Sequence, residues 1–307
     1  MSELCAAIDL GTNTARLLIG TCHDGIIDQK FIMRRITRLG GGFSAEIGIS
    51  TDARNRSLLV MKDFSEKLEE YDIKRLRAVA TSAVRDAANG ARFCAEVFEE
   101  TGIQLEVIDG HTEGVLTLNG VFAGLDNVPE QVLVFDVGGG STEYTLAKGG
   151  KPCFSRSLPL GVVRLTEGKQ DIPAMSDKID RELAALMAEL QEHGLLGMAK
   201  SSITVGTAGT ATTLAAISMQ MADYDYRKVN NYCLSLKEIE SIFAKLLPMT
   251  PAERLMVTGM EKGREDLIIA GTLLTIKTLA CFGSTMLKVS DFGLLEGALL
   301  SVCGYAG

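Results

Sequence analysis

Residues 132 to 147, VLVFDVGGGSTEYTLA, constrain the fold of this chain more than any other stretch. Apolar residues typical of β-strands lie on both sides of a glycine turn at residues 138 to 140, and this pattern predicts a β-hairpin. Glycine adopts positive φ without steric cost and lets a ligand approach the backbone closely. The polar residues beside the turn are Asp136, Ser141, Thr142 and Glu143.

This predicted hairpin is either an ordinary glycine-rich turn or a phosphate-binding turn. In the second interpretation, the backbone N–H groups of the turn and the two hydroxyls bind phosphate oxygens. The two carboxylates hold a magnesium ion, which neutralises the bound phosphate. The candidate phosphate-binding residues are therefore Gly138, Gly139, Gly140, Ser141 and Thr142, and the candidate metal ligands are Asp136 and Glu143.

Residues 4 to 20, LCAAIDLGTNTARLLIG, repeat the pattern of an apolar strand, a D-x-G turn rich in hydroxyls, and a second apolar strand. The aspartates of the two D-x-G turns, Asp9 and Asp136, lie 127 positions apart, which is a typical domain length. We therefore expect a duplicated domain that presents two similar hairpins to one cleft. In the first hairpin the candidate phosphate-binding residues are Thr12, Asn13, Thr14 and Arg16, and the candidate metal ligand is Asp9.

Two strand-to-helix junctions offer further anion-binding sites, because the N-terminus of a helix presents free backbone N–H groups. In residues 76 to 90, Ser82 follows the predicted strand and Arg85 lies on the first turn of the predicted helix. Residues 201 to 218 form the second junction, which is not a Walker A loop because it lacks G-K-[ST]. The candidate phosphate-binding residues of this second junction are Gly206, Thr207, Gly209 and Thr210.

Glu113 is predicted on the first turn of a helix within residues 104 to 124. An acid at that position ordinarily offsets the helix dipole, and a catalytic role is the alternative interpretation. Arg264 and Asp266 are predicted to begin a later helix that extends to residue 282. They form either an exposed capping pair or two side chains that reach the cleft.

The composition narrows the class of protein. At 307 residues two domains are expected, with LDNVPEQ after Gly124 as their linker. Seven scattered cysteines without a C-x-x-C, and three histidines, favour reduced thiols over zinc or disulfides. The net charge of −8 argues against a nucleic acid polymer as partner. The start MSEL has no basic leader, and no apolar run reaches the ~18 residues of a membrane span, so we expect a soluble, cytoplasmic protein without membrane partners.

Seven motifs follow one another in an order and spacing typical of one protein family. They are AIDLGTNTARLL at 7 to 18, RLG at 38 to 40, AVATSAVRDAAN at 78 to 89, FDVGGGSTE at 135 to 143, SLPLGVVRLTE at 157 to 167, VGTAGTATTLA at 205 to 215 and GREDLIIAG at 263 to 271. On these motifs the chain resembles the Ppx/GppA phosphatase family, the exopolyphosphatases and guanosine pentaphosphate phosphohydrolases, and in particular its short, two-domain members.

The resemblance implies an α/β fold of two duplicated domains around a central cleft, of the actin-like, Hsp70 and sugar-kinase type, which is ribonuclease H-like. We expect the domains to be residues 1–127 and 128–307, with the last helix packing back on the first domain. The implied activity is hydrolysis of a terminal phosphoanhydride, which releases orthophosphate from inorganic polyphosphate or from guanosine pentaphosphate, an alarmone of the stringent response. The implied cofactor is Mg²⁺, with K⁺ as a further candidate ion, and a homodimer is the candidate oligomer.

The resemblance also implies catalytic residues. The family's catalytic glutamate lies in a segment similar to I-S-G-E-E-E-A-R-L, which aligns with residues 108 to 116, where only Glu113 keeps its acid. Glu113 therefore takes the catalytic role, and Arg85, from the family's A-T-S-A-x-R loop, is expected to offset charge on the transferred phosphoryl group. Val115 and Leu295 stand where arginines are usual in the family.

The loss of these two cations is expected to weaken the binding of long polyphosphate, or else to indicate a smaller phosphate ester or weak activity. Two alternative functions stay open. An ATP-dependent small-molecule kinase of the same superfold would consume ATP only with an acceptor present. A non-catalytic sensor of alarmone or polyphosphate would bind guanosine tetraphosphate tightly without hydrolysing any phosphoanhydride.

Overall fold

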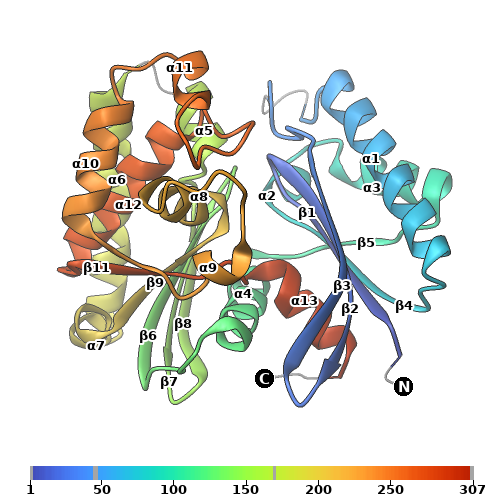
Figure 1. Cartoon of the computed structure of the whole chain (residues 1–307), viewed down its shortest axis with the longest axis horizontal. Helices are drawn as coiled ribbons and strands as arrows, with labels where there is room; N and C mark the ends of the chain where they lie inside the picture. Colours follow the sequence, from blue (N-terminus) through green and yellow to red (C-terminus); the bar gives the residue numbers. More distant parts are fainter. Residues whose placement is uncertain (1–2, 44–47, 169–170, 305–307) are drawn as a thin grey trace. The chain divides into compact units, whose positions relative to one another are not determined.

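The computed structural model describes residues 3–43, 48–168 and 171–304, and the chain divides into two compact units (Figure 1). Unit 1 consists of Met1–Ala123 together with Gly293–Gly307, and unit 2 consists of Gly124–Phe292. The last helix, α13 (Leu294–Val302), therefore belongs to unit 1. Among the described residues, no helix is long and apolar enough to cross a membrane.

Unit 1 contains a five-stranded mixed sheet with the strand order β3-β2-β1-β4-β5. Its strands are β1 (Cys5–Leu10), β2 (Thr14–His23), β3 (Ile26–Ile36), β4 (Arg75–Ala80) and β5 (Leu105–Val107). Its helices are α1 (Thr51–Glu70), α2 (Ser82–Arg85), α3 (Gly90–Thr101), α4 (Gly110–Gly124) and α13. β1 pairs antiparallel with β2 and parallel with β4, so the chain returns to the sheet through a crossover that contains α1.

Unit 2 contains a six-stranded mixed sheet with the strand order β10-β11-β9-β6-β7-β8. Its strands are β6 (Gln131–Val137), β7 (Thr142–Lys148), β8 (Lys151–Leu158), β9 (Ile203–Thr207), β10 (Cys233–Ser235) and β11 (Met286–Val289). Its helices are α5 (Val162–Gly168), α6 (Ile172–Glu192), α7 (Leu196–Ser201), α8 (Ala208–Ser218), α9 (Tyr226–Val229), α10 (Leu236–Leu246), α11 (Pro251–Leu255) and α12 (Ile268–Phe282).

The two sheets share one topology. The order β8-β7-β6-β9-β11 in unit 2 repeats β3-β2-β1-β4-β5 in unit 1. In each, an antiparallel three-stranded meander is followed by two strands that continue the sheet in parallel. The duplication inferred from the two D-x-G turns is thus visible in the strand order. β10, which pairs antiparallel with β11, is an additional strand that the sequence did not predict.

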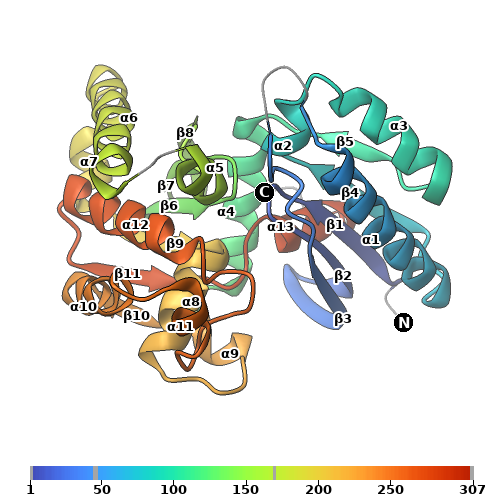
Figure 2. The ribbon, with the colours of Figure 1, turned by 90° about the horizontal axis from the view of Figure 1, so that it is seen from above.

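The side chains of the unit 1 sheet alternate between two buried faces. On one face, Ile8 packs in a cluster with Phe64 of α1 and Val97 of α3. On the other face, Leu18 packs in a separate cluster with Leu299 of α13. Figure 2 shows α1 and α3 on one side of this sheet and α13 on the other. The sheet is therefore the middle layer of unit 1, and helices cover both of its faces.

Helices α4 and α13 pack closely because both carry glycine at the contact. A Cβ added to Gly297 would overlap the carbonyl oxygen of Leu116, and one added to Gly120 would overlap the carbonyl of Gly293. Any larger residue at either position would push the two helices apart. This contact fixes α4, the helix that carries Glu113, against α13 in unit 1.

The core of unit 2 is one apolar cluster between its sheet and the helices of the unit, mainly α5, α6, α8, α10 and α12. Phe135 of β6 and Tyr144 of β7 stack with ring centroids 6.1 Å apart. The Tyr144 hydroxyl is buried and shares a 2.7 Å hydrogen bond with the Thr278 hydroxyl of α12. A buried polar group at this position is therefore satisfied, and it fixes α12 on the sheet.

Two helices of unit 2 have well-defined starts. α6 begins at Ile172, and Asp171 caps it by accepting a hydrogen bond from the backbone N–H of Ala174. α12 begins at Ile268, whereas Arg264 and Asp266 lie in the turn before it. The expectation that Arg264 and Asp266 begin this helix is therefore wrong by a few residues.

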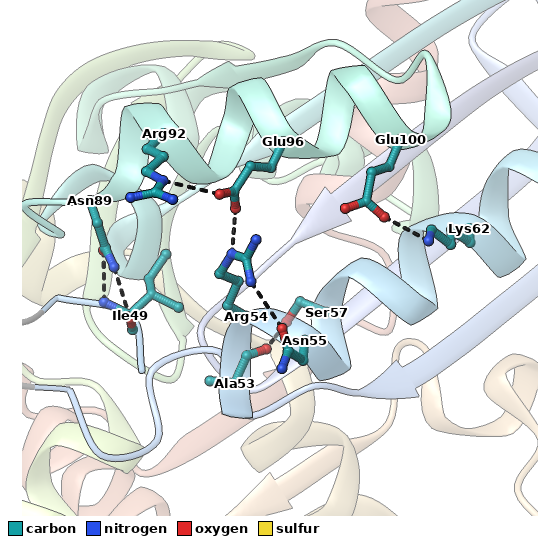
Figure 3. A network of polar contacts seen from close by, with 10 residues as sticks. All are labelled: Ile49, Ala53, Arg54, Asn55, Ser57, Lys62, Asn89, Arg92, Glu96 and Glu100. Atoms are coloured by element: carbon teal, nitrogen blue, oxygen red, sulfur yellow. Dashed lines mark hydrogen bonds and ion pairs between the residues drawn. The ribbon is translucent and has the colours of Figure 1, made fainter. Parts of the chain in front are cut away.

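Asn89 joins α3 to the segment before α1 in unit 1 (Figure 3). Its side-chain amide donates to the carbonyl of Ile49 at 2.8 Å and accepts from the N–H of Ile49 at 2.9 Å. Nearby, the Glu96 carboxylate accepts hydrogen bonds from Arg54 of α1 and from Arg92 of α3. These polar contacts tie α1 to α3 across the surface of the unit.

We predict that Asn89→Ala lowers the free energy of unfolding by about 2 kcal/mol, because it leaves both backbone groups of buried Ile49 without their partner. Urea denaturation measures the change. The matched control is Asn55→Ala on an exposed surface of α1, which is expected to stay within about 0.5 kcal/mol of the parent. Equal midpoints for the two variants would contradict the role of Asn89.

Candidate functional site

The turn between β1 and β2 carries the first group of candidate residues. Asp9 lies directly opposite Arg16 in the sheet register. Both Nη2 and Nε of Arg16 donate to Oδ2 of Asp9, at 2.7 and 3.1 Å. Asp9 was predicted as a metal ligand and Arg16 as a phosphate-binding residue. The structure pairs the two side chains with each other, and both roles stay predictions. Arg16 offsets the charge of a mostly buried carboxylate, so Asp9 alone attracts a cation less strongly.

The same turn lies next to α2. The hydroxyls of Thr12 and Ser82 are buried and share a hydrogen bond of 3.0 Å, although the two residues are 70 positions apart. The N–H of Gly11 donates to the carbonyl of Thr14, which closes the turn. The N–H of Gly40 donates to the carbonyl of Thr12 and holds the turn from its other side. The β1–β2 turn and the start of α2, which the sequence analysis treated as two separate candidate phosphate sites, are therefore neighbours in the structure.

Asn13 is the clearest sign of a ligand in this turn. Its side chain belongs to a residue only 4% exposed, and neither amide atom has a hydrogen-bond partner within the described ranges. Its backbone carbonyl is in use, because it accepts from the N–H groups of Thr37 and Arg38. An unpartnered buried amide costs about 1–3 kcal/mol, so the position fits a polar ligand that supplies the missing partners.

Arg85 and Glu113 form the second group in unit 1. Nη1 of Arg85 donates to Oε2 of Glu113 at 3.3 Å and to the carbonyl of Ile108 at 3.0 Å. Glu113 is 7% exposed and lies on the first turn of α4. Asp109 precedes this turn, and its carboxylate accepts a 2.7 Å hydrogen bond from the N–H of Thr112. That bond holds the pKa of Asp109 below its usual range and fixes the start of α4.

Helix α2 connects the two groups of unit 1. Ser82 at its first residue contacts Thr12 of the β1–β2 turn, and Arg85 at its last residue contacts Glu113. This short helix therefore contacts the candidate phosphate-binding turn through its first residue and the candidate catalytic carboxylate of Glu113 through its last residue.

In unit 2, Asp136 of β6 lies directly opposite Glu143 of β7, so the two carboxylates share one face of the sheet. Both are buried, at 8% and 2% exposure. The Ser157 hydroxyl donates to Oε1 of Glu143 at 2.7 Å and orients it. Opposed carboxylates repel each other unless a cation lies near them. The pair therefore fits Mg²⁺, which binds one or two carboxylates and completes its shell with water and substrate phosphate.

No group of three or more His, Cys, Asp or Glu side chains within residues 3–43, 48–168 and 171–304 is arranged to hold a metal ion. A metal at Asp136 and Glu143 thus depends on oxygens from substrate and water for the rest of its shell.

The glycine turn after β6 packs against the start of α5. The N–H groups of Val162 and Val163 donate to the carbonyls of Gly138 and Gly139, at 3.0 and 2.9 Å. The hydrogen bonds found among the described residues leave the N–H groups of residues 139 to 141 unused. The carbonyls of the turn are thus engaged by protein, whereas its N–H groups stay available for an anion.

Two predicted phosphate-binding hydroxyls of unit 2 already donate to protein carbonyls. Thr142 is fully buried and donates to the carbonyl of Leu160 at 2.8 Å. Thr207 is buried and donates to the carbonyl of Phe292 at 3.0 Å. These contacts hold the loops that contain the two threonines, and the phosphate-binding role of Thr142 and Thr207 stays a prediction.

The side chain of Arg264 lies at the β9–α8 junction, where the sequence analysis did not place it. A Cβ added to Gly209 would overlap the guanidinium of Arg264, so that side chain lies directly over the first turn of α8. Ala208 has a φ of +63°, which is unusual for a residue with a side chain. Thr210 is buried beside Gly271 of α12. In the sequence, Arg264 is visible as part of the GRED motif at 263 to 266. Its contact with Gly209 could not be predicted, because the two residues are far apart in the chain.

The two departures from the family pattern lie in different environments. Leu295 of α13 is fully buried in the cluster that contains Ala7 and Leu18, where a guanidinium would be costly. Val115 of α4 is half-buried. Leu295 therefore serves the packing of α13 on the sheet.

The β1–β2 and β6–β7 hairpins, together with the repeated β-β-β-α-β topology, define a two-domain α/β protein of the actin-like type. The predicted fold class is therefore confirmed. The model of the Ppx/GppA phosphatase family matches residues 22–306. The PPX-GPPA enzyme of Aquifex aeolicus is 34% identical over 98% of this chain and 100% of its own, with a TM-score of 0.79. An exopolyphosphatase from Cytophaga hutchinsonii is 26% identical over 99% of each chain, with a TM-score of 0.89.

Curated relatives agree with this assignment. Exopolyphosphatase 2 of Mycobacterium tuberculosis is 32% identical, over 97% of this chain and 98% of its own length. A bifunctional 3-dehydroquinate synthase/phosphatase of Fusobacterium nucleatum is 31% identical over 97% of this chain, which spans 46% of that longer protein. The chain belongs to the Ppx/GppA phosphatase family, and it is an exopolyphosphatase-like member.

Proposed function

We propose that this protein hydrolyses terminal phosphoanhydride bonds and releases orthophosphate from inorganic polyphosphate or guanosine pentaphosphate. The observation that carries the proposal is the position of α2, whose Ser82 contacts the β1–β2 turn and whose Arg85 contacts Glu113. A buried carboxylate held by a guanidinium, beside a turn with an unpartnered amide, suits the activation of water near a phosphate. The family of the chain and its exopolyphosphatase relatives support the same reaction.

The proposed roles follow from the needs of phosphoryl transfer, in which a loose transition state carries charge on its equatorial oxygens. Glu113 orients the attacking water and accepts its proton. Arg85 keeps the Glu113 carboxylate in place and offsets charge on the transferred group, an electrostatic contribution of about 3 kcal/mol by analogy with single oxyanion donors.

In this proposal each unit has its own phosphate-binding turn. In unit 2, the N–H groups of Gly139, Gly140 and Ser141 bind phosphate oxygens, because no hydrogen bond among the described residues uses them. In unit 1, the amide of Asn13 gains through phosphate the partners that the protein does not supply. Arg264 at the start of α8 and the free N–H groups of that helix provide a further anion site.

Asp136 and Glu143 are the proposed ligands of Mg²⁺, and Asp9 stays a predicted ligand whose charge is shared with Arg16. When bound, the ion neutralises phosphate charge and favours displacement at phosphorus. We predict that excess EDTA lowers phosphate release by at least ~10²-fold and that added Mg²⁺ restores it, because opposed buried carboxylates otherwise repel a polyanion. Undiminished release in EDTA, measured with a colorimetric phosphate assay, would contradict the metal assignment.

The experiment that tests the proposed function compares phosphate release with Mg²⁺ across long polyphosphate, short polyphosphate, guanosine pentaphosphate and ATP. Release from polyphosphate or guanosine pentaphosphate with water alone is the expected result. Consumption of ATP only after an alcohol or carboxylic acid acceptor is added would instead identify a kinase. No hydrolysis of any phosphoanhydride, together with tight binding of guanosine tetraphosphate, would identify a sensor.

A further inference from the structure

Three of the seven cysteines lie together in unit 1, away from the residues proposed for catalysis. They are Cys5 on β1, Cys22 on β2 and Cys303, the residue that ends α13. All are free thiols, and they are up to 298 positions apart in the sequence. The proposed hydrolytic function uses none of them.

The sheet register explains why Cys5 and Cys22 share a face. Cys5 lies directly opposite Gly20, and Cys22 is two residues beyond Gly20 on the same strand. Side chains two residues apart on a strand point to the same face, so Cys5 and Cys22 are diagonal neighbours across the β1–β2 pair. This is the face that α13 covers.

α13 brings the third thiol to the same place. Leu295, Ala298 and Leu299 lie in the apolar cluster with Cys5 and Leu18, and Val302, Cys22 and Cys303 pack against that cluster. Cys22 and Cys303 therefore lie against the same cluster as Cys5, and the three thiols are close enough to affect one another's ionisation. The end of α13 is fixed on β4 as well, because Arg77 donates to the Ser301 hydroxyl at 2.8 Å and Arg75 donates to the carbonyl of Val302.

We propose that Cys22 and Cys303 are an oxidation site that takes a peroxide and forms a disulfide between β2 and the end of α13. Both are half-buried and reachable by a small oxidant, whereas Cys5 is 1% exposed. The Cys22 thiolate attacks one peroxide oxygen, the O–O bond breaks, and hydroxide leaves, so that Cys22 becomes a sulfenic acid. The Cys303 thiol then attacks that sulfur, the S–O bond breaks, and water leaves as the S–S bond forms. Two thiols are oxidised and one peroxide is reduced to two waters.

The environment of the thiols sets the pH dependence of this reaction. Burial raises the pKa of Cys303, and of its neighbour Cys5, to about 11, and it raises the pKa of Cys22 above its usual value. The charged groups that act on the cluster are Arg75 of β4, which lowers these pKa values, and Glu3, which raises that of Cys5. Since the thiolate is the reactive form, the rate of oxidation is expected to rise about tenfold per pH unit between pH 7 and 9.

The test treats the full-length chain with hydrogen peroxide, digests it without reduction, and identifies linked peptides by mass spectrometry. The expected result is an intramolecular link between Cys22 and Cys303, the loss of two titratable thiols, and reversal by dithiothreitol. A bond that closes so long a loop is expected to raise the Tm by at least about 5 °C over the reduced protein.

Matched variants separate this site from the other thiols. Cys303→Ser, and as a second form Cys303→Ala, should lose both the link and the Tm shift. Cys5→Ser should retain the link, and so should Cys94→Ser, which removes a half-buried cysteine of unit 1 outside the cluster. Absence of a Cys22–Cys303 link in the parent protein, a link that uses Cys5 instead, or an unchanged Tm shift in Cys303→Ser would overturn the proposal.

Discussion

Replacement of Glu113 with Gln is expected to lower the turnover of polyphosphate by ~10²- to 10⁴-fold, because it removes the proposed base and keeps the shape of the side chain. The Gln amide oxygen can still accept the hydrogen bond that Arg85 donates at 3.3 Å to Glu113. The fold and the position of α4 should therefore be retained, and kcat should fall with little change in KM. A steady-state phosphate-release assay measures both parameters.

Glu99→Gln is the matched control for this variant, because Glu99 is an exposed glutamate on α3 of the same unit. It should keep the kcat of the parent protein, and thermal unfolding should show that both variants are folded. A folded Glu113→Gln variant with the parent's turnover would show that another group activates the water.

Gly161→Ala is expected to have the second large effect, through the glycine turn of unit 2. A Cβ at this position would overlap the carbonyl of Gly139 and the carbonyl carbon of Gly140. Because these are backbone atoms, the turn must shift to admit a methyl group. Displacement of a binding group by about 1 Å can cost 10²-fold in rate, so phosphate release should fall by that order. The unfolding free energy should also fall, by about 1–3 kcal/mol.

Gly197→Ala on α7 provides the control for a methyl group alone, since a Cβ there meets no atom within 4 Å. It should leave phosphate release unchanged and add up to about 1 kcal/mol of stability through helix propensity. If Gly161→Ala also kept full activity, the geometry of the glycine turn would not matter for the reaction.

Local patterns in the sequence were sufficient to predict the main parts of the fold. The two D-x-G hairpins are determined by residues close in sequence, and the structure contains both of them. The additional strand β10 was not predicted because its three residues carry too little signal and depend on pairing with β11.

The contacts within the candidate site could not be predicted in the same way, because they join residues far apart in sequence. Asp9 and Arg16 are opposite each other within one hairpin, which is a local feature. That Arg16 donates hydrogen bonds to the Asp9 carboxylate, a predicted metal ligand, is clear only from the side-chain geometry. The partner of Thr142 is Leu160, and the cation beside Gly209 is Arg264. The sequence shows which residues can bind a ligand or take part in a reaction, whereas their hydrogen-bond partners depend on tertiary packing.

The central claim is that Glu113 activates a water molecule that cleaves a terminal phosphoanhydride. Hydrolysis of polyphosphate in ¹⁸O-labelled water, followed by mass spectrometry of the released orthophosphate, tests this claim most directly. We predict one ¹⁸O atom in each orthophosphate released in a single turnover by the parent protein, and a labelled product formed at least ~10²-fold more slowly by Glu113→Gln. Unlabelled orthophosphate, or labelled product formed equally fast by the variant, would contradict the account.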